Sequence, residues 1–360
     1  MVSDLIKTVF IVRHGERLDH IDKSWQPDPS QGIWDPPLTS VGFEQAKRTG
    51  ATLRNMTKKH KEDDDQSAAA TYIIIYTSPF QRCIDTSLGL IRGFCTSNKT
   101  TDDTEEELSF TLKLDLGLTE WMSESLFEEG IDCSASQFLT RQHEKLARQQ
   151  AYTYSVSAAS RNSKKFITGD IDESLILPPA LQIDYAYRNP NFTELEFPEN
   201  YNDMIQRFEQ TRRSCLKNAA IQQQDHYSSI KSSTDNVIVI FVTHAVGVNA
   251  LLDGFRNQTT IPLESKYCSI SCLRRLSSST SDSTSMLTYT SDQSDVQSED
   301  DELAEYYDDG IDDRRKRQGS LVQQQLQQSP HDQTATPTIS KEMWSIQCTM
   351  SDSHLSHLTS

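Results

Sequence analysis

Short runs of consecutive apolar residues, each followed by polar residues, dominate the pattern of this chain. The clearest runs are 9–12, 72–76 and 237–242. A strand that is apolar at every position, and not only at alternate ones, is typical of a parallel sheet covered by helices on both faces. The pattern therefore predicts an α/β fold with three layers (α/β/α) and a mainly parallel central sheet.

Helices are expected between these strands. The first opens at 38–42 with Thr39 or Ser40 as its N-cap and continues to about Asn55. A second helix begins near Pro79, because proline fits the first turn of a helix, and a third covers 245–255. These helices supply the outer layers of the expected fold.

The middle of the chain has a different pattern. Residues 123–234 are mostly helical in pattern, with a break at Pro178 and Pro179 and one helix from Pro198 to about Gln223. We interpret this region as a helical insertion above the sheet.

The C-terminal part indicates two further strands separated by a polar segment. The strands are expected at 267–276 and 341–348. The segment 277–340 is rich in Ser, Asp, Glu and Gln and has few aromatic residues, a composition typical of disorder. We therefore expect one domain formed by 1–276 and 341–350, interrupted by a disordered acidic insertion at 277–340.

Charge limits the partners that the chain can bind. The net charge of the 360 residues is -17, and 277–340, with thirteen acidic and four basic residues, contributes -9 of it. A chain this acidic does not bind a nucleic-acid backbone through bulk electrostatics, so any phosphate site must be a local basic one.

Membrane insertion, secretion and zinc binding are not expected. No run approaches the roughly 18 apolar residues of a membrane helix, and the N-terminus lacks a signal-peptide pattern. The seven cysteines are scattered, and Cys268 and Cys272 have no His or Cys cluster after them. We expect reduced thiols in the cytoplasm or nucleus and no metal or other cofactor.

Cationic side chains follow each of the three apolar runs. Arg13 and His14 end the first run, Arg82 lies one helical turn beyond the second, and His244 follows the third. Each alone is more often a packing or solvated residue, but parallel sheets bind ligands at the carboxyl ends of their strands. Two arginines and two histidines at that edge predict a phosphate site.

The loop 16–37 follows the first run directly and would lie over this site. Its tryptophans, Trp25 and Trp34, either face a substrate or pack the loop onto the core, and the sequence leaves both interpretations open.

Three motifs together resemble the histidine phosphatase superfamily, also called phosphoglycerate-mutase-like. They are Arg13-His14-Gly15-Glu16, the segment 78–86 (Ser-Pro-x-x-Arg-Cys-x-x-Thr), and Thr243-His244. The resemblance covers roughly 8–275, with the closing strand near 341–348. It is nearest to a eukaryotic branch that begins RHGER-x-D, which includes the TULA phosphatase domain and a fungal tau subunit of transcription factor IIIC.

The resemblance implies a mechanism. His14 would be the nucleophile that forms a phosphohistidine, and Arg13, Arg82 and His244 would hold the phosphoryl oxygens. A carboxylic acid must protonate the leaving group, and the family's pattern points to Glu120. The fallback acids are Glu16 and Glu124.

Two departures from related branches narrow the expected activity. Residues 16–19 (Glu-Arg-Leu-Asp) differ from the Glu-Ser-x-x-Asn pattern of cofactor-dependent mutases. Ala245 stands where the acid-phosphatase branch has an Asp after its second histidine, which favours Glu120 as the acid.

The expected function is therefore hydrolysis of a phosphomonoester, on either a small molecule or a phosphoprotein. The alternative is an interaction subunit on the same fold, like the tau subunit, with 277–340 as a contact arm for a protein partner. Residues 314–317 (Arg-Arg-Lys-Arg) are then either a nuclear localisation signal or basic residues that offset the charge of the acidic run. A mutase or bisphosphatase of glycolytic sugars is the least favoured reading, and neither nucleic acid nor membrane is an expected direct partner.

Overall fold

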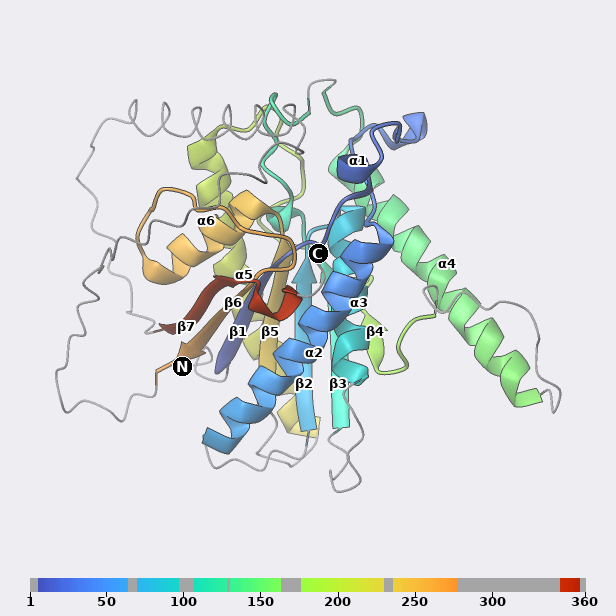
Figure 1. Ribbon diagram of the computed structural model, residues 1–360, viewed down its shortest axis with the longest axis vertical. Coiled ribbons are helices and arrows are strands. Elements are labelled where there is room, and N and C mark those ends of the chain that lie inside the picture. Colours follow the sequence, from blue (N-terminus) through green and yellow to red (C-terminus); the bar gives the residue numbers. More distant parts are fainter. Residues whose placement is uncertain are drawn as a thin grey trace, which may run out of the picture. The chain divides into compact units, whose positions relative to one another are not determined.

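Seven strands form one sheet in the computed structural model, which describes residues 6–63, 70–96, 107–127, 130–162, 176–229, 236–276 and 344–356. Their order across the sheet is β4-β3-β2-β5-β1-β6-β7 (Figure 1). Five strands are parallel to one another: β1 (Thr8–Arg13), β2 (Ala70–Thr77), β3 (Glu107–Leu114), β4 (Leu181–Ile183) and β5 (Asn236–Thr243). The remaining two, β6 (Ile270–Arg275) and β7 (Trp344–Ser351), are antiparallel. The predicted α/β fold with a mainly parallel sheet is confirmed.

Helices cover both faces of this sheet. The helices of the described residues are α1 (Leu18–Ile21), α2 (Ser40–Asp63), α3 (Gln81–Cys95), α4 (Ala135–Asn162), α5 (Tyr201–Ser229) and α6 (Ala245–Arg256), with short 3-10 turns at Pro29–Gln31, Leu116–Leu118 and Ser353–Leu355. In Figure 1, α2 and α3 lie in front of the sheet, whereas α5 passes behind it. Among the described residues, no helix has the length and apolar character needed to cross a membrane.

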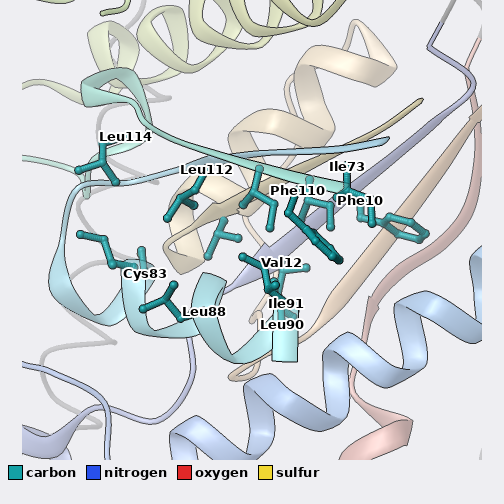
Figure 2. Packing of buried hydrophobic residues seen from close by; sticks show 14 of the residues in the cluster. Phe10, Val12, Ile73, Cys83, Leu88, Leu90, Ile91, Phe110, Leu112 and Leu114 are labelled. Atoms are coloured by element: carbon teal, nitrogen blue, oxygen red, sulfur yellow. The ribbon is translucent and has the colours of Figure 1, made fainter. Parts of the chain in front are cut away.

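The main core lies between the sheet and α3 (Figure 2). Phe10 and Val12 of β1 point into it together with Leu88 and Ile91 of α3. The alternate residues of the strands are also fully buried, on the opposite face; they include Val9, Ile11, Ile74, Tyr76, Val239 and Phe241. Burial at every strand position is the arrangement that the uninterrupted apolar runs predict.

Helix α2 starts where the sequence predicts and ends later. Its start is capped by Thr39, whose hydroxyl accepts a hydrogen bond from the backbone N–H of Gly42 at 2.9 Å. The helix continues through 56–63, so the predicted end near Asn55 is too early. The segment contains no Gly or Pro, and lysine is compatible with a helix.

Two strands were not anticipated. The sequence pattern predicted no strand at 107–114, but β3 occupies these residues and pairs with β2 along its whole length. The short strand β4 lies within 123–234, which was expected to be helical, and pairs with β3 at Phe110, Thr111 and Leu112. Three residues are too few to display the alternation of a strand, so tertiary pairing determines β4.

The rest of 123–234 contains the long helices α4 and α5. Helix α5 begins at Tyr201, and the side chain of the preceding Asn200 caps it by accepting a hydrogen bond from the Asp203 N–H at 3.0 Å. The helix ends at Ser229, beyond the expected end at Gln223. The segment 277–340, which was predicted to be disordered, lies outside the described residues. The strands that flank it pair with each other: Arg275 of β6 and Trp344 of β7 are partners in one antiparallel ladder.

Glycine allows α2 and α3 to pack at backbone distance. A Cβ atom placed on Gly50 would lie 2.0 Å from the carbonyl oxygen of Leu90, and one on Gly93 would lie 1.9 Å from that of Lys47. The atoms that each added Cβ would approach belong to the backbone of the facing helix. A backbone atom cannot move away by a rotamer change, as a side-chain atom could.

Replacement of Gly50 by alanine should therefore destabilise the fold. We expect Gly50→Ala to lower the free energy of unfolding by about 2 kcal/mol, because overpacking outweighs the better helix propensity of alanine. Urea denaturation of both proteins measures the difference. Gly254→Ala is the matched control: its new methyl group would meet the flexible end of the Glu209 side chain, so its stability should stay within about 1 kcal/mol of wild type. Equal losses in the two variants would contradict this account.

Candidate active site

The register of the parallel strands brings the predicted residues together. Arg13 at the end of β1 is the ladder partner of Thr243 at the end of β5. The His14 N–H donates to the carbonyl of Thr243 at 2.9 Å, and the Ser78 N–H donates to that of Val242 at 3.0 Å. Three strand ends are thus held side by side at the same edge of the sheet.

His14 is held in a single tautomer. Its side chain is buried, and Nδ1 lies 2.8 Å from the carbonyl oxygen of Gly15. A carbonyl oxygen can only accept, so Nδ1 carries the proton and Nε2 keeps its lone pair. Desolvation, followed by the positive charges of Arg82 and Arg13, holds the pKa of His14 well below its ordinary value. The imidazole is neutral and nucleophilic near neutral pH.

The second histidine lies beside the first. The ring centroids of His14 and His244 are 5.4 Å apart. Nδ1 of His244 is 3.1 Å from Nη2 of Arg82, which can only donate, and Nε2 is 2.9 Å from the hydroxyl of Ser78. His244 therefore accepts from Arg82 and donates from Nε2. Burial and the charge of Arg82 hold its pKa well below the ordinary value.

Arg82 projects from the first turn of α3 and is 2% exposed. Its Nη2 also lies 3.5 Å from a carboxylate oxygen of Glu120, and its Nη1 is 3.9 Å from Asp35. Nε and Nη1 are buried and make no hydrogen bond within the described part of the chain. Two unsatisfied buried donors are costly, and an anion bound at this point would satisfy them.

Arg13 is fixed from the other side of the site. Its guanidinium donates to the carbonyl of Ser265 and lies 4.4 Å from the ring centroid of Tyr267. The same ring is 5.8 Å from that of His14. Tyr267 thus orients Arg13 beside His14 through a cation–π contact.

Glu120 also reaches the site. It follows the 3-10 turn Leu116–Leu118, and its Oε2 lies 3.3 Å from Nδ1 of His244. Of the two fallback acids, Glu16 accepts a hydrogen bond from the Thr39 hydroxyl at 2.6 Å, and Glu124 is exposed. Glu120 is the candidate acid for which the structure gives contacts with both His244 and Arg82.

The loop after β1 packs on itself. Trp34 donates from its indole N–H to Asp19 at 3.0 Å and lies edge-on to Trp25, with ring centroids 5.0 Å apart. Asp19 also accepts two hydrogen bonds from Arg17. Trp34 also packs against the buried cluster that contains Phe80 and Phe138, which is the packing of the loop onto the core that the sequence left open.

Several residues around the site were missed from the sequence. Asp35 accepts from the N–H of Gln81 at 2.7 Å and so fixes the start of α3, which carries Arg82. Tyr267 lies in no sequence motif that would mark it as a site residue. Ser78 could have been identified only from its place in the Ser-Pro motif at 78–86. Arg17 lies in the RHGER motif, and its charge contributes to the lowered pKa of His244.

The site is suited to a tetrahedral dianion. It combines two guanidinium groups, two neutral imidazoles and one carboxyl group, and α6 begins directly after His244. The amides at a helix start favour anions. Within the described ranges, no group of three or more His, Cys, Asp or Glu side chains could hold a metal ion.

Comparisons with known proteins agree with the resemblance seen in the sequence. Residues 9–111 match the model of the histidine phosphatase superfamily (branch 1). This range contains Arg13, His14 and Arg82, whereas Glu120 and His244 lie beyond it. The expected resemblance to the superfamily is confirmed for this part of the chain.

The individual proteins that match are similar to this chain either over a short stretch or at low sequence identity. The chain is 35% identical over 83 residues to the transcription factor tau 55 kDa subunit of Saccharomyces cerevisiae, which is 23% of this chain and 16% of that protein. It is also similar to the phosphoglycerate mutase of Bacillus anthracis, at 15% identity and a TM-score of 0.35, over 76% of this chain and 90% of that one. A mycobacterial glucosyl-3-phosphoglycerate phosphatase matches at 14% identity and a TM-score of 0.35, over 75% and 90% of the two chains.

The geometry predicts that His14 is neutral at pH 6. Because its pKa is held below the ordinary value of about 6.5, the ring should remain uncharged with the proton on Nδ1, whereas an ordinary histidine would be mostly protonated. Long-range proton–nitrogen correlation spectra of the protein, assigned with His14→Ala, report the tautomer and charge. The urea-unfolded chain is the control. A cationic His14 at pH 6 would contradict the described geometry.

Proposed function

We propose that this protein hydrolyses phosphomonoesters through a phosphohistidine on His14. The observation that supports this most is Arg82: two of its buried donors, Nε and Nη1, lack hydrogen-bond partners within the described residues, in a site that also presents a neutral imidazole. A phosphoryl group supplies the acceptor oxygens that these donors need.

The first step transfers the phosphoryl group. Nε2 of His14 attacks phosphorus and the P–O ester bond breaks, while Arg13 and Arg82 hold the equatorial oxygens. Once Arg82 donates to the phosphoryl group and no longer to His244, His244 can carry its proton on Nδ1, accept from the Ser78 hydroxyl at Nε2 and donate to a third oxygen. Glu120, in its acid form, gives its proton to the leaving oxygen, which departs as an alcohol. The Nδ1–H of His14 stays bonded to the Gly15 carbonyl, which stabilises the positive ring of the intermediate.

The second step returns the enzyme to its starting state. Water attacks phosphorus, the P–N bond to His14 breaks, and the Glu120 carboxylate takes one proton from the water. The products are hydrogen phosphate, neutral His14 and protonated Glu120, so charge and protons balance over the cycle.

The substrate is a phosphorylated small molecule or a phosphoprotein, handled in the cytoplasm or nucleus. A mutase is less favoured because residues 16–19 depart from the mutase pattern.

Substitution of the nucleophile tests this function. His14→Ala should abolish turnover of 4-nitrophenyl phosphate, with at least about a thousand-fold loss in kcat, and should remove the acid-labile phosphohistidine that wild type forms. Phosphate release and phosphohistidine blotting measure both effects. Cys95→Ser, at an exposed thiol, is the control and should match wild type. A wild-type protein that turns over no ester in a broad panel would refute the proposal.

A second candidate function is that of an interaction subunit. The observation in its favour is the similarity to the transcription factor tau 55 kDa subunit. In this reading, 277–340 contacts a protein partner and the anion site is dispensable. The tagged full chain should then co-purify with subunits of a tau-like transcription factor, and His14→Ala should do so equally well. Quantitative mass spectrometry of the purified material tests this, and recovery no greater than that of an unrelated tagged protein would contradict it.

A further inference from the structure

We propose that Arg207 and Glu199 form a clamp that positions Glu120 for proton transfer. The inference rests on the proposed function, and it assigns the two residues a positioning role without contact with substrate. We call these two side chains, with the hydrogen bonds they make to 117–122, the acid clamp.

Arg207 reaches from α5 to the segment that carries Glu120. Its Nη1 donates to the carbonyl oxygens of Gly117 at 2.9 Å and Thr119 at 3.1 Å, and its Nη2 donates to that of Glu120 at 3.2 Å. One guanidinium thus satisfies three carbonyls within four consecutive residues. The planar fork of arginine makes this possible, and lysine has no equivalent arrangement of donors.

Glu199 holds the same segment from its C-terminal side. Its backbone N–H donates to the Met122 carbonyl at 2.8 Å, and its backbone carbonyl accepts from the indole N–H of Trp121 at 2.9 Å. Its carboxylate accepts from the Met122 N–H at 3.3 Å. Glu120 therefore has clamped backbone on both of its sides.

The two halves of the clamp are joined by a bidentate ion pair. Nε of Arg207 is 2.7 Å from Oε1 of Glu199, and Nη2 is 2.8 Å from Oε2. The side chains are only 10% and 2% exposed. Both charges are largely removed from water. The five Arg207 hydrogen bonds go to the Glu199 carboxylate or to backbone carbonyls around Glu120.

The Glu120 side chain itself is held loosely. Oε2 lies 3.5 Å from Arg82 and 3.3 Å from His244, and Oε1 accepts from the Trp121 N–H at 3.1 Å. The two long contacts leave Oε2 free to transfer a proton but do not fix its position, and the bond to the Trp121 N–H ties Oε1 only to the neighbouring backbone. The backbone hydrogen bonds of the clamp supply that position, and small misplacements of a catalytic group reduce rates strongly.

The clamp should affect one part of the reaction selectively. Proton donation matters for a poor leaving group such as an alkoxide and matters little for 4-nitrophenolate, which leaves without help. Loosening the clamp should therefore lower kcat/KM for an alkyl phosphate much more than for 4-nitrophenyl phosphate. Anion binding by Arg13, Arg82 and the histidines should be unchanged.

Arg207→Lys tests the inference, with glycerol 2-phosphate and 4-nitrophenyl phosphate as paired substrates. We expect kcat/KM to fall about 30-fold for the alkyl ester and less than about threefold for the aryl ester. Inhibition by vanadate should stay within about twofold of wild type, because the anion site is intact. Glu199→Gln, which keeps the shape of the side chain, should give the same selective loss and replaces Arg207→Lys if that variant fails to fold.

Arg212→Lys is the matched control. Arg212 lies on the same helix, is 7% exposed, pairs with Glu209 at 2.8 Å and lies over the ring of Phe255 at 4.7 Å. It should leave both kcat/KM values near wild type. Equal losses for the two esters in Arg207→Lys and Glu199→Gln, or a selective loss in Arg212→Lys as well, would overturn the clamp. Wild type that hydrolyses neither ester would instead refute the proposed hydrolase function on which the clamp rests.

Discussion

Two backbone hydrogen bonds between strand ends hold this site together. They join His14 to Thr243 and Ser78 to Val242, at 2.9 and 3.0 Å. Because the strands are parallel, these bonds bring the residues that follow each strand to one edge of the sheet. The contact between two histidines distant in sequence, and the reach of Arg82 to both His244 and Glu120, depend on this register. A one-residue slip would also turn the buried side chains of each strand to the other face.

Burial determines the electrostatic character of the site. It keeps His14 and His244 neutral, while the guanidiniums of Arg13 and Arg82 retain their charge. Asp35 and Glu120 lie 3.9 and 3.5 Å from Arg82, but Glu120 starts the proposed cycle in its neutral acid form, so the two guanidinium charges are not fully balanced. A local positive site therefore exists in a chain whose net charge is -17. Long-range attraction does not bring anions to such a protein, so binding must come from short-range hydrogen bonds.

The features that could be predicted from the sequence are those that depend on burial and on the position of residues at strand ends. Uninterrupted apolar runs indicated the parallel strands, and the residues at their ends indicated Arg13, His14, Arg82 and His244. Glu120 came only from the family resemblance, because a single carboxylate after a turn has no pattern of its own. Arg207 and Glu199 could not be found, since their partners are mostly backbone atoms of a distant segment. The strand β4 was missed because pairing with β3, and not its own composition, determines it.

The ladder between β6 and β7 has a consequence for how this protein can change over evolutionary time. Arg275 and Trp344 are direct partners across the two strands, so the residues between them join two neighbouring positions of the sheet. The entropic cost of joining two such neighbours increases only with the logarithm of the number of residues between them. Insertions and deletions between the two positions should therefore cost the fold little stability, which leaves the length of this connection free to vary.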